Sequence, residues 1–221
     1  MARSPRGWPI DEFATPRPDI WPAIVQQLKE TQQVEYKAAG VLETSEHKLC
    51  VAACAMSNTR DGGYLVVGVE QTESGSFKLE GISDELLGKI SLDDLKRKII
   101  DSGSPRPDID LHQIEFEGRT FLLMTVRPSS RRPVICVAAR GAESNGGSRA
   151  GVIYYRTGAA ESAPATATDW EEIITRFYAE ERVRALSEAK SAGLLVSTED
   201  RDAVQLRADA EMFDAEIEEF R

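Results

Sequence analysis

The sequence has few of the features that mark secreted, membrane-spanning or phosphate-loop proteins. Its three cysteines are an odd number in apolar surroundings, which favours reduced thiols over a disulfide framework. No apolar run approaches the ~20 residues that a membrane-spanning helix needs, and the N-terminus lacks a signal peptide's apolar core. A Gly-x4-Gly-Lys-Ser/Thr loop is also missing, which excludes ATP hydrolysis by that route. We therefore expect a cytoplasmic protein without a membrane association.

Acidic charge is concentrated in the C-terminal quarter of the chain. The formal net charge is −10, of which residues 1–160 carry −1 and residues 161–221 carry −9. Salt screens charges over a Debye length of ~8 Å, so a basic patch on the nearly neutral part could still act locally. An acidic total does not exclude a nucleic-acid-binding function.

The 221 residues suit one domain with appendages, since domains usually run to ~100–200 residues. Residues 1–22 hold five of the ten prolines and two of the three tryptophans, which predicts an extended N-terminal arm. We expect the domain itself in residues 23–165 and an acidic helical extension in residues 166–221.

Alternating helical and strand patterns predict an α/β (α+β) fold, with a mixed sheet of about five or six strands and flanking helices. Residues 64–69 form a short, almost entirely apolar run, which is typical of a strand that is buried on both faces. Capping boxes at Ser91/Asp94 and Thr168/Glu171 predict two helix starts. The other expected elements are helices at 23–30 and 44–58, a strand at 33–37, a hairpin of 109–116 with 120–126, and a strand pair of 133–138 with 152–156.

Carboxylates flank two of the predicted strands. Glu35 and Lys37 are two residues apart on one strand, so their side chains should project from the same face. A carboxylate there could hold a divalent cation, and the neighbouring ammonium could stabilise charge on a phosphate. Such a pair also occurs often as a simple solvated ion pair. Glu30 precedes this strand, and Glu70 ends the apolar strand.

Basic and aromatic side chains provide candidate contacts to a sugar-phosphate backbone. Arg60 precedes the Asp61-Gly62-Gly63 turn, whose amides could meet a phosphate, although a plain structural turn explains the glycines equally well. The remaining candidates lie near the end of the predicted domain: Arg127, Arg131, Arg132, Tyr155 and Arg156.

Four ordered motifs resemble the Schlafen AlbA-type family, which is described as a DNA-binding domain in bacterial proteins. They are Val34-Glu-Tyr-Lys37, Ala55-Met-Ser-Asn-Thr59 continued by Gly62-Gly-Tyr-Leu-Val-Val-Gly-Val69, Glu80-Gly-Ile82 and Tyr155-Arg-Thr-Gly158. The resemblance spans roughly residues 27–165.

In Schlafen endoribonucleases three carboxylates form a metal-dependent site, and the resemblance places them at Glu30, Glu35 and Glu70. It thus implies Mg²⁺ or Mn²⁺ as cofactor, with Lys37 stabilising charge during cleavage of structured RNA. The family usually has Asp where this chain has Glu70, which moves the third ligand by about one methylene.

Two functions follow from these observations. The first is binding of RNA or DNA, and its more specific version is metal-dependent cleavage of RNA. The second is a non-catalytic assembly or regulatory module. Tandem Schlafen lobes occur in one chain of vertebrate proteins, so the single lobe here implies a homodimer or higher homo-oligomer. A heptad of apolar positions within residues 197–221 could dock on the chain's own body, on another subunit or on a partner protein.

Overall fold

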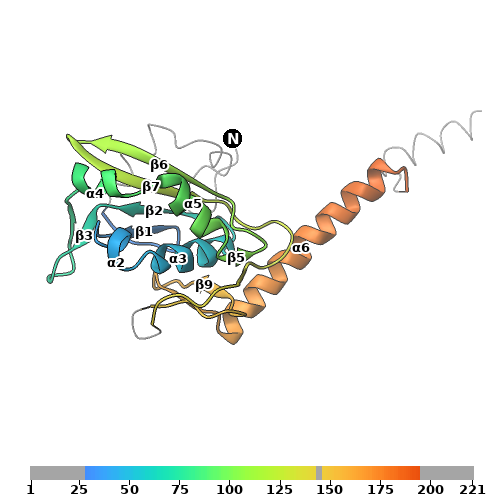
Figure 1. The fold of residues 1–221 in the computed structure, drawn as a ribbon. Helices are drawn as coiled ribbons and strands as arrows, with labels where there is room; N and C mark the ends of the chain where they lie inside the picture. Colours follow the sequence, from blue (N-terminus) through green and yellow to red (C-terminus); the bar gives the residue numbers. More distant parts are fainter. Residues whose placement is uncertain (1–27, 143–145, 195–221) are drawn as a thin grey trace, which may run out of the picture. The chain divides into compact units, whose positions relative to one another are not determined.

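A computed structural model describes residues 28–142 and 146–194. The predicted arm at 1–22 and the heptad segment at 197–221 lie outside the described residues. The described chain has an α/β fold, as its patterning predicts (Figure 1). Its largest sheet is mixed and has the order β1-β2-β7-β6, in which β1 runs parallel to β2 and the other pairs are antiparallel. These strands are Val34–Lys37, Gly63–Val67, Arg119–Val126 and Ile109–Phe116.

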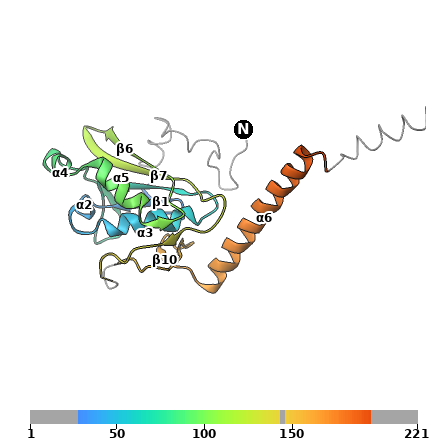
Figure 2. The ribbon, with the colours of Figure 1, turned by 45° about the vertical axis from the view of Figure 1, so that its right-hand side comes forward.

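Helix α3 (His47–Ser57) forms the centre of the core. Residues 49–57 are all buried, because Ala, Cys and Ser side chains let neighbouring elements approach on more than one side. One side packs with β2, β7 and α5 (Leu92–Ile100), and another packs with β8 (Ile135–Cys136) and β9 (Tyr154–Arg156). Figures 1 and 2 show α3 between the sheet and the β9 region.

The opposite face of the sheet is also covered. Val34, Tyr36, Val66 and Phe121 belong to a second apolar cluster, which includes residues from β3 (Val69–Gln71) and β4 (Phe77–Leu79). Strand β2 is therefore buried along its whole length, as its apolar run predicts.

The local signals for α5 and the hairpin are confirmed. Ser91 accepts a hydrogen bond at its hydroxyl from the backbone amide of Asp94, and α5 follows directly. The hairpin pairs Ile109 with Val126 and Phe116 with Arg119, around a Glu117-Gly118 turn with positive φ at both residues. The shorter helices of the domain are α2 (Val41–Thr44) and α4 (Asp84–Lys89).

Three predicted elements differ from the structure. Residues 28–30 are not helical, and residues 23–27 lie outside the described part of the chain. In place of the expected pair of 133–138 with 152–156, β8 pairs with β5 (Gly103–Ser104) and β9 pairs with β10 (Ser162–Pro164), both antiparallel. Among these described residues, only Cys136 keeps backbone hydrogen bonds to Gly151 and Val152. Helix α6 (Ala167–Ser191) begins earlier than predicted, because Thr166 and Asp169 form the reciprocal cap in place of Thr168 and Glu171.

The contacts within the chain divide it between Phe177 and Tyr178 into two units, and α6 belongs in part to each. Among the described helices, none has an apolar stretch long enough to cross a membrane.

Candidate functional site

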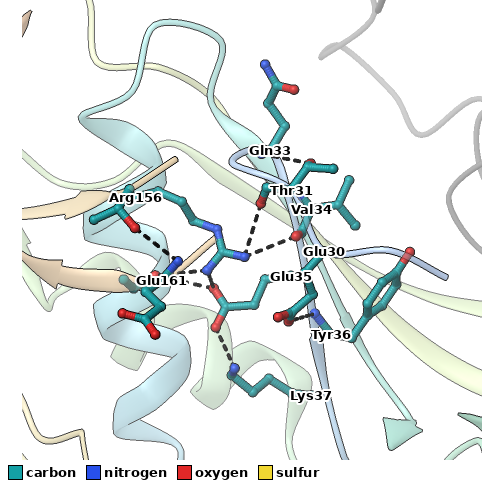
Figure 3. A network of polar contacts seen from close by, with 11 residues as sticks. Glu30, Thr31, Gln33, Val34, Glu35, Tyr36, Lys37, Arg156 and Glu161 are labelled. Atoms are coloured by element: carbon teal, nitrogen blue, oxygen red, sulfur yellow. Dashed lines mark hydrogen bonds and ion pairs between the residues drawn. The ribbon is translucent and has the colours of Figure 1, made fainter. Parts of the chain in front are cut away.

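Glu35 and Arg156 form a buried ion pair between β1 and β9. Glu35 is 5% exposed and Arg156 is 1% exposed, and the Arg156 Nη1 to Glu35 Oε2 distance is 2.7 Å. The Arg156 Nη2 atom donates to the carbonyl oxygens of Thr31 and Val34 at 3.2 and 3.0 Å (Figure 3). The guanidinium therefore joins the strand that carries Tyr155 and Arg156 to the start of the main sheet.

Lys37 lies on the same face of β1 as Glu35, as the two-residue spacing predicts. Its Nζ is 2.5 Å from the Glu35 Oε1, and its side chain is 27% exposed. Figure 3 shows one oxygen of Glu35 directed at Arg156 and the other at Lys37. Each oxygen of this carboxylate thus faces one cation, and Ser162 adds a hydroxyl donor at 3.3 Å.

Glu30 also has a local structural partner. Its Oε1 accepts a hydrogen bond from the backbone amide of Tyr36 at 3.0 Å, which holds the segment before β1 against the strand (Figure 3). Tyr36 is 4% exposed, and burial raises the pKa of its hydroxyl to about 12.

Glu70 is exposed on β3, opposite Lys78 of β4. Hydrogen bonding and charge repulsion from the neighbouring Glu80 raise the pKa of Glu70, while Lys78 lowers the pKa of Glu80. Its described polar neighbours are therefore the residues of the β3–β4 hairpin.

These carboxylates do not fit a divalent cation in this arrangement. A metal ion needs carboxylate oxygens that are free to coordinate it, whereas both Glu35 oxygens contact cations and Glu30 accepts from a backbone amide. Within residues 28–142 and 146–194, no three His, Cys, Asp or Glu side chains are grouped so that they could hold a metal ion.

The predicted nucleic-acid contacts fall into two groups. Tyr155 and Arg156 are buried, at 2% and 1% exposed, so the expectation of an exposed Tyr-Arg surface on this strand is corrected. Tyr155 instead packs with Ile153 and Ile173 of α6, and burial together with Glu172 raises its pKa. Arg156 can be buried because the Glu35 carboxylate compensates the charge of its guanidinium inside the protein.

The second group is exposed or partly exposed. Arg60 lies in the turn after α3, and Arg131 and Arg132 lie in the loop between β7 and β8. Arg127 is partly exposed and contacts Asp108 and Asp110 at 2.9 and 2.6 Å. With Arg106, residues Arg127, Arg131 and Arg132 line a pocket of about 520 Å³. We call it the arginine pocket.

The Gly62-Gly63 turn has a structural explanation. Gly62 has φ of +65°, and a Cβ there would lie 2.1 Å from the carbonyl oxygen of Val126. A Cβ on Gly63 would lie 2.8 Å from the Met56 sulfur. Both positions need glycine for the close approach of α3, β2 and β7, so the turn does not require a phosphate to explain it.

Asn58, part of the Asn-Thr motif, has a structural role in the fold that the sequence analysis did not predict. Its side chain is 1% exposed and donates to the carbonyls of Val134 and Tyr154, both at 2.9 Å. It also accepts from the Val134 amide at 2.7 Å. The sequence offered one signal for this role: a side-chain amide directly after a helix that is predicted to be buried. A buried amide needs hydrogen-bond partners.

The fold and these contacts define a class: an α/β domain in which a buried Glu–Arg ion pair joins the edge strand β1 of the main sheet to the later β9–β10 hairpin. The profile of the family described as "Schlafen, AlbA_2" matches residues 30–165, so the chain belongs to this family. Membership implies a nucleic-acid-binding domain.

A search of solved structures matches the DIP2311 protein of Corynebacterium diphtheriae, at 19% identity and a TM-score of 0.44. That match covers 70% of this chain and 32% of the other, so the chain spans about a third of that protein's length. Another is the N-terminal domain of a DNA helicase RecG-related protein of Nitrosomonas europaea, at 20% identity and a TM-score of 0.38, covering 54% of this chain and 84% of the other. Comparison with curated protein sequences finds no match.

Proposed function

We propose that this protein binds nucleic acid through the arginine pocket and the surface around it. The observation that carries the proposal is the gathering of four arginines at one pocket. Arg106 and Arg127 pair with aspartates there, so the proposal assigns phosphate contacts to the exposed Arg131 and Arg132. Arginine is suited to phosphate because its planar guanidinium offers several donors in fixed geometry. The family membership supports the same class of ligand.

The surrounding structure fixes the loops that carry these arginines. The backbone amide of Ser129 donates to the carbonyl of Ser57 at 2.8 Å. Arg176 donates to the carbonyl of Ser129 at 3.1 Å and to that of Thr59. The turn that carries Arg60 and the loop that carries Arg131 and Arg132 are therefore tied to one another, which favours a preformed surface.

A salt titration tests the proposal. Fluorescence anisotropy with a labelled single-stranded oligonucleotide should give a log Kd that rises linearly with log salt concentration. The double substitution Arg131→Ala, Arg132→Ala should weaken binding and reduce that slope by about 1.4, because each lost phosphate contact on a single strand contributes ~0.7.

The matched control removes two cations elsewhere. Lys89 and Arg97 are exposed on α4 and α5, where each pairs with a neighbour on its own helix. The variant Lys89→Ala, Arg97→Ala has the same net charge as the test variant. An equal loss of affinity in both variants would show a nonspecific charge effect and contradict the proposal, as would an affinity independent of salt.

Metal-dependent cleavage of structured RNA is the competing function for the same family. It would use Glu30, Glu35 and Glu70 with Mg²⁺ or Mn²⁺, and the contacts of Glu35 oppose it. Incubation of transfer RNA, ribosomal RNA and single-stranded DNA with Mn²⁺ or with EDTA separates the two functions. Cleavage that needs Mn²⁺ and is lost in Glu35→Gln would refute a purely binding role.

A further inference from the structure

The arginine pocket contains a buried hydroxyl that has no hydrogen-bond partner. Ser57 is the last residue of α3, is 1% exposed and lines this pocket. Among the described residues, its Oγ has no hydrogen-bond partner. Serine hydroxyls in helices usually bond to a carbonyl one turn earlier, and unsatisfied buried hydroxyls are unfavourable. The Ser57 Oγ has less than 1 Å² of exposed surface, so a ligand phosphate reaches it only when the side chain turns toward the pocket.

The other lining residues include apolar, charged and serine side chains. Pro105, Pro107, Pro128 and Val134 give the pocket apolar walls, and the four arginines and Asp108 add charge. A volume of about 520 Å³ lies in the range of ~300–1,000 Å³ typical of small-molecule sites. The combination of apolar walls with cationic groups suits a ligand that has a flat apolar part and an anionic part.

We propose that the pocket takes one unstacked nucleotide of a single-stranded nucleic acid, with its phosphate bound by Arg131, Arg132 and the Ser57 hydroxyl. The inference rests on the proposed function and narrows it to single strands. In a duplex the base is stacked and paired, so a nucleotide enters such a pocket only after it leaves the helix, whereas a single strand offers it directly. The sugar and base then lie against the proline rings.

Ser57→Ala gives a signature that separates ligand binding from folding. Removing an unsatisfied hydroxyl should leave thermal stability unchanged or slightly raised, because nothing in the protein loses a partner. Affinity for AMP, measured by calorimetry, should fall about tenfold, the effect of losing one hydrogen bond to a charged group.

Ser102→Ala is the matched control. Ser102 is also 1% exposed, but its hydroxyl donates to the carbonyl of Ile99 at 2.6 Å and it does not line the arginine pocket. This variant should melt at a lower temperature and bind AMP as the unsubstituted protein does. The two serine variants therefore have opposite expected effects on stability and on affinity.

A comparison of AMP, adenosine and a single-stranded decamer tests whether the pocket binds a nucleotide through its phosphate. AMP should displace a labelled single-stranded decamer, and adenosine should bind at least tenfold more weakly than AMP because it lacks the phosphate. The proposal is overturned if the decamer binds but AMP does not displace it, or if Ser57→Ala leaves AMP affinity unchanged. It is also overturned if Ser57→Ala weakens a duplex as much as the single strand. Failure of both the decamer and AMP to bind overturns the proposed function as well.

Discussion

Replacing Arg156 with Met should strongly destabilise the protein while leaving its overall fold intact. Methionine keeps much of the apolar stem and removes the guanidinium, so the Glu35 Oε2 loses its ion pair and the carbonyls of Thr31 and Val34 lose a donor. Breaking a buried ion pair by removing one partner costs ~3–5 kcal/mol, against a total stability of ~5–15 kcal/mol. At ~2–4 °C per kcal/mol for a chain of this size, the melting temperature should fall by about 6–20 °C.

Urea and thermal unfolding followed by circular dichroism measure the effect, with Arg97→Met as the control. Arg97 is 72% exposed and its pair with Asp94 lies on the helix surface, so its loss should change stability by less than ~1 kcal/mol. A double-mutant cycle with Glu35→Gln should give a coupling of ~1–3 kcal/mol. A folded Arg156→Met protein within 1 kcal/mol of the parent would refute the structural role of the pair and leave Glu35 available for another ligand.

Three further predictions follow from the buried polar groups and the C-terminal sequence. Asn58→Ala should lower the free energy of unfolding in urea by about 3 kcal/mol or more, because three backbone groups of Val134 and Tyr154 lose their hydrogen-bond partner. An effect below ~1 kcal/mol would mean that water replaces the amide. The pKa of Tyr36 is about 12 in the folded protein and ~10 in the unfolded chain. Its contribution to the free energy of unfolding is therefore complete below the unfolded pKa and is lost as the pH rises toward 12. Because the pKa of Tyr155 is also raised, absorbance titration should show one fewer late-ionising tyrosine in Tyr36→Phe than in the parent, and identical titrations would refute the prediction. Deleting residues 197–221 should lower the mass found by light scattering if the predicted heptad joins subunits, and an unchanged assembly mass would place the contact elsewhere.

The expectation for Glu35→Gln shows how a tertiary contact changes the sign of a prediction. From the sequence, three neighbouring carboxylates should repel one another, so removing one charge should raise stability. In the structure Glu35 is flanked by Arg156 and Lys37, so the same substitution should lower stability. Arg156 is 121 residues away in the chain, and no local pattern connects the two side chains.

The elements that were predictable from sequence are those whose cause is local. The alternation of 109–116 and 120–126 and the Ser91 cap each depend on residues within a few positions, and each occurs in the structure. The apolar run of 64–69 occurs in part, because the strand ends at Val67 and Gly68, with φ of +107°, separates it from β3. The pairing of 133–138 was not predictable in the same way. Its partner strand, Gly103–Ser104, is two residues long and has no apolar pattern of its own.

The sequence by itself determined the α/β class, the family, and the shared face of Glu35 and Lys37, because periodicity, motif order and strand geometry act over short distances. Only the tertiary structure decided that Arg156 lies inside the protein while Arg131 and Arg132 remain exposed. An arginine is stable inside a protein when a distant carboxylate and free carbonyls meet it there, as Glu35, Thr31 and Val34 do. That meeting depends on the packing of β9 beside the start of β1, which brings together parts of the chain that are far apart in sequence.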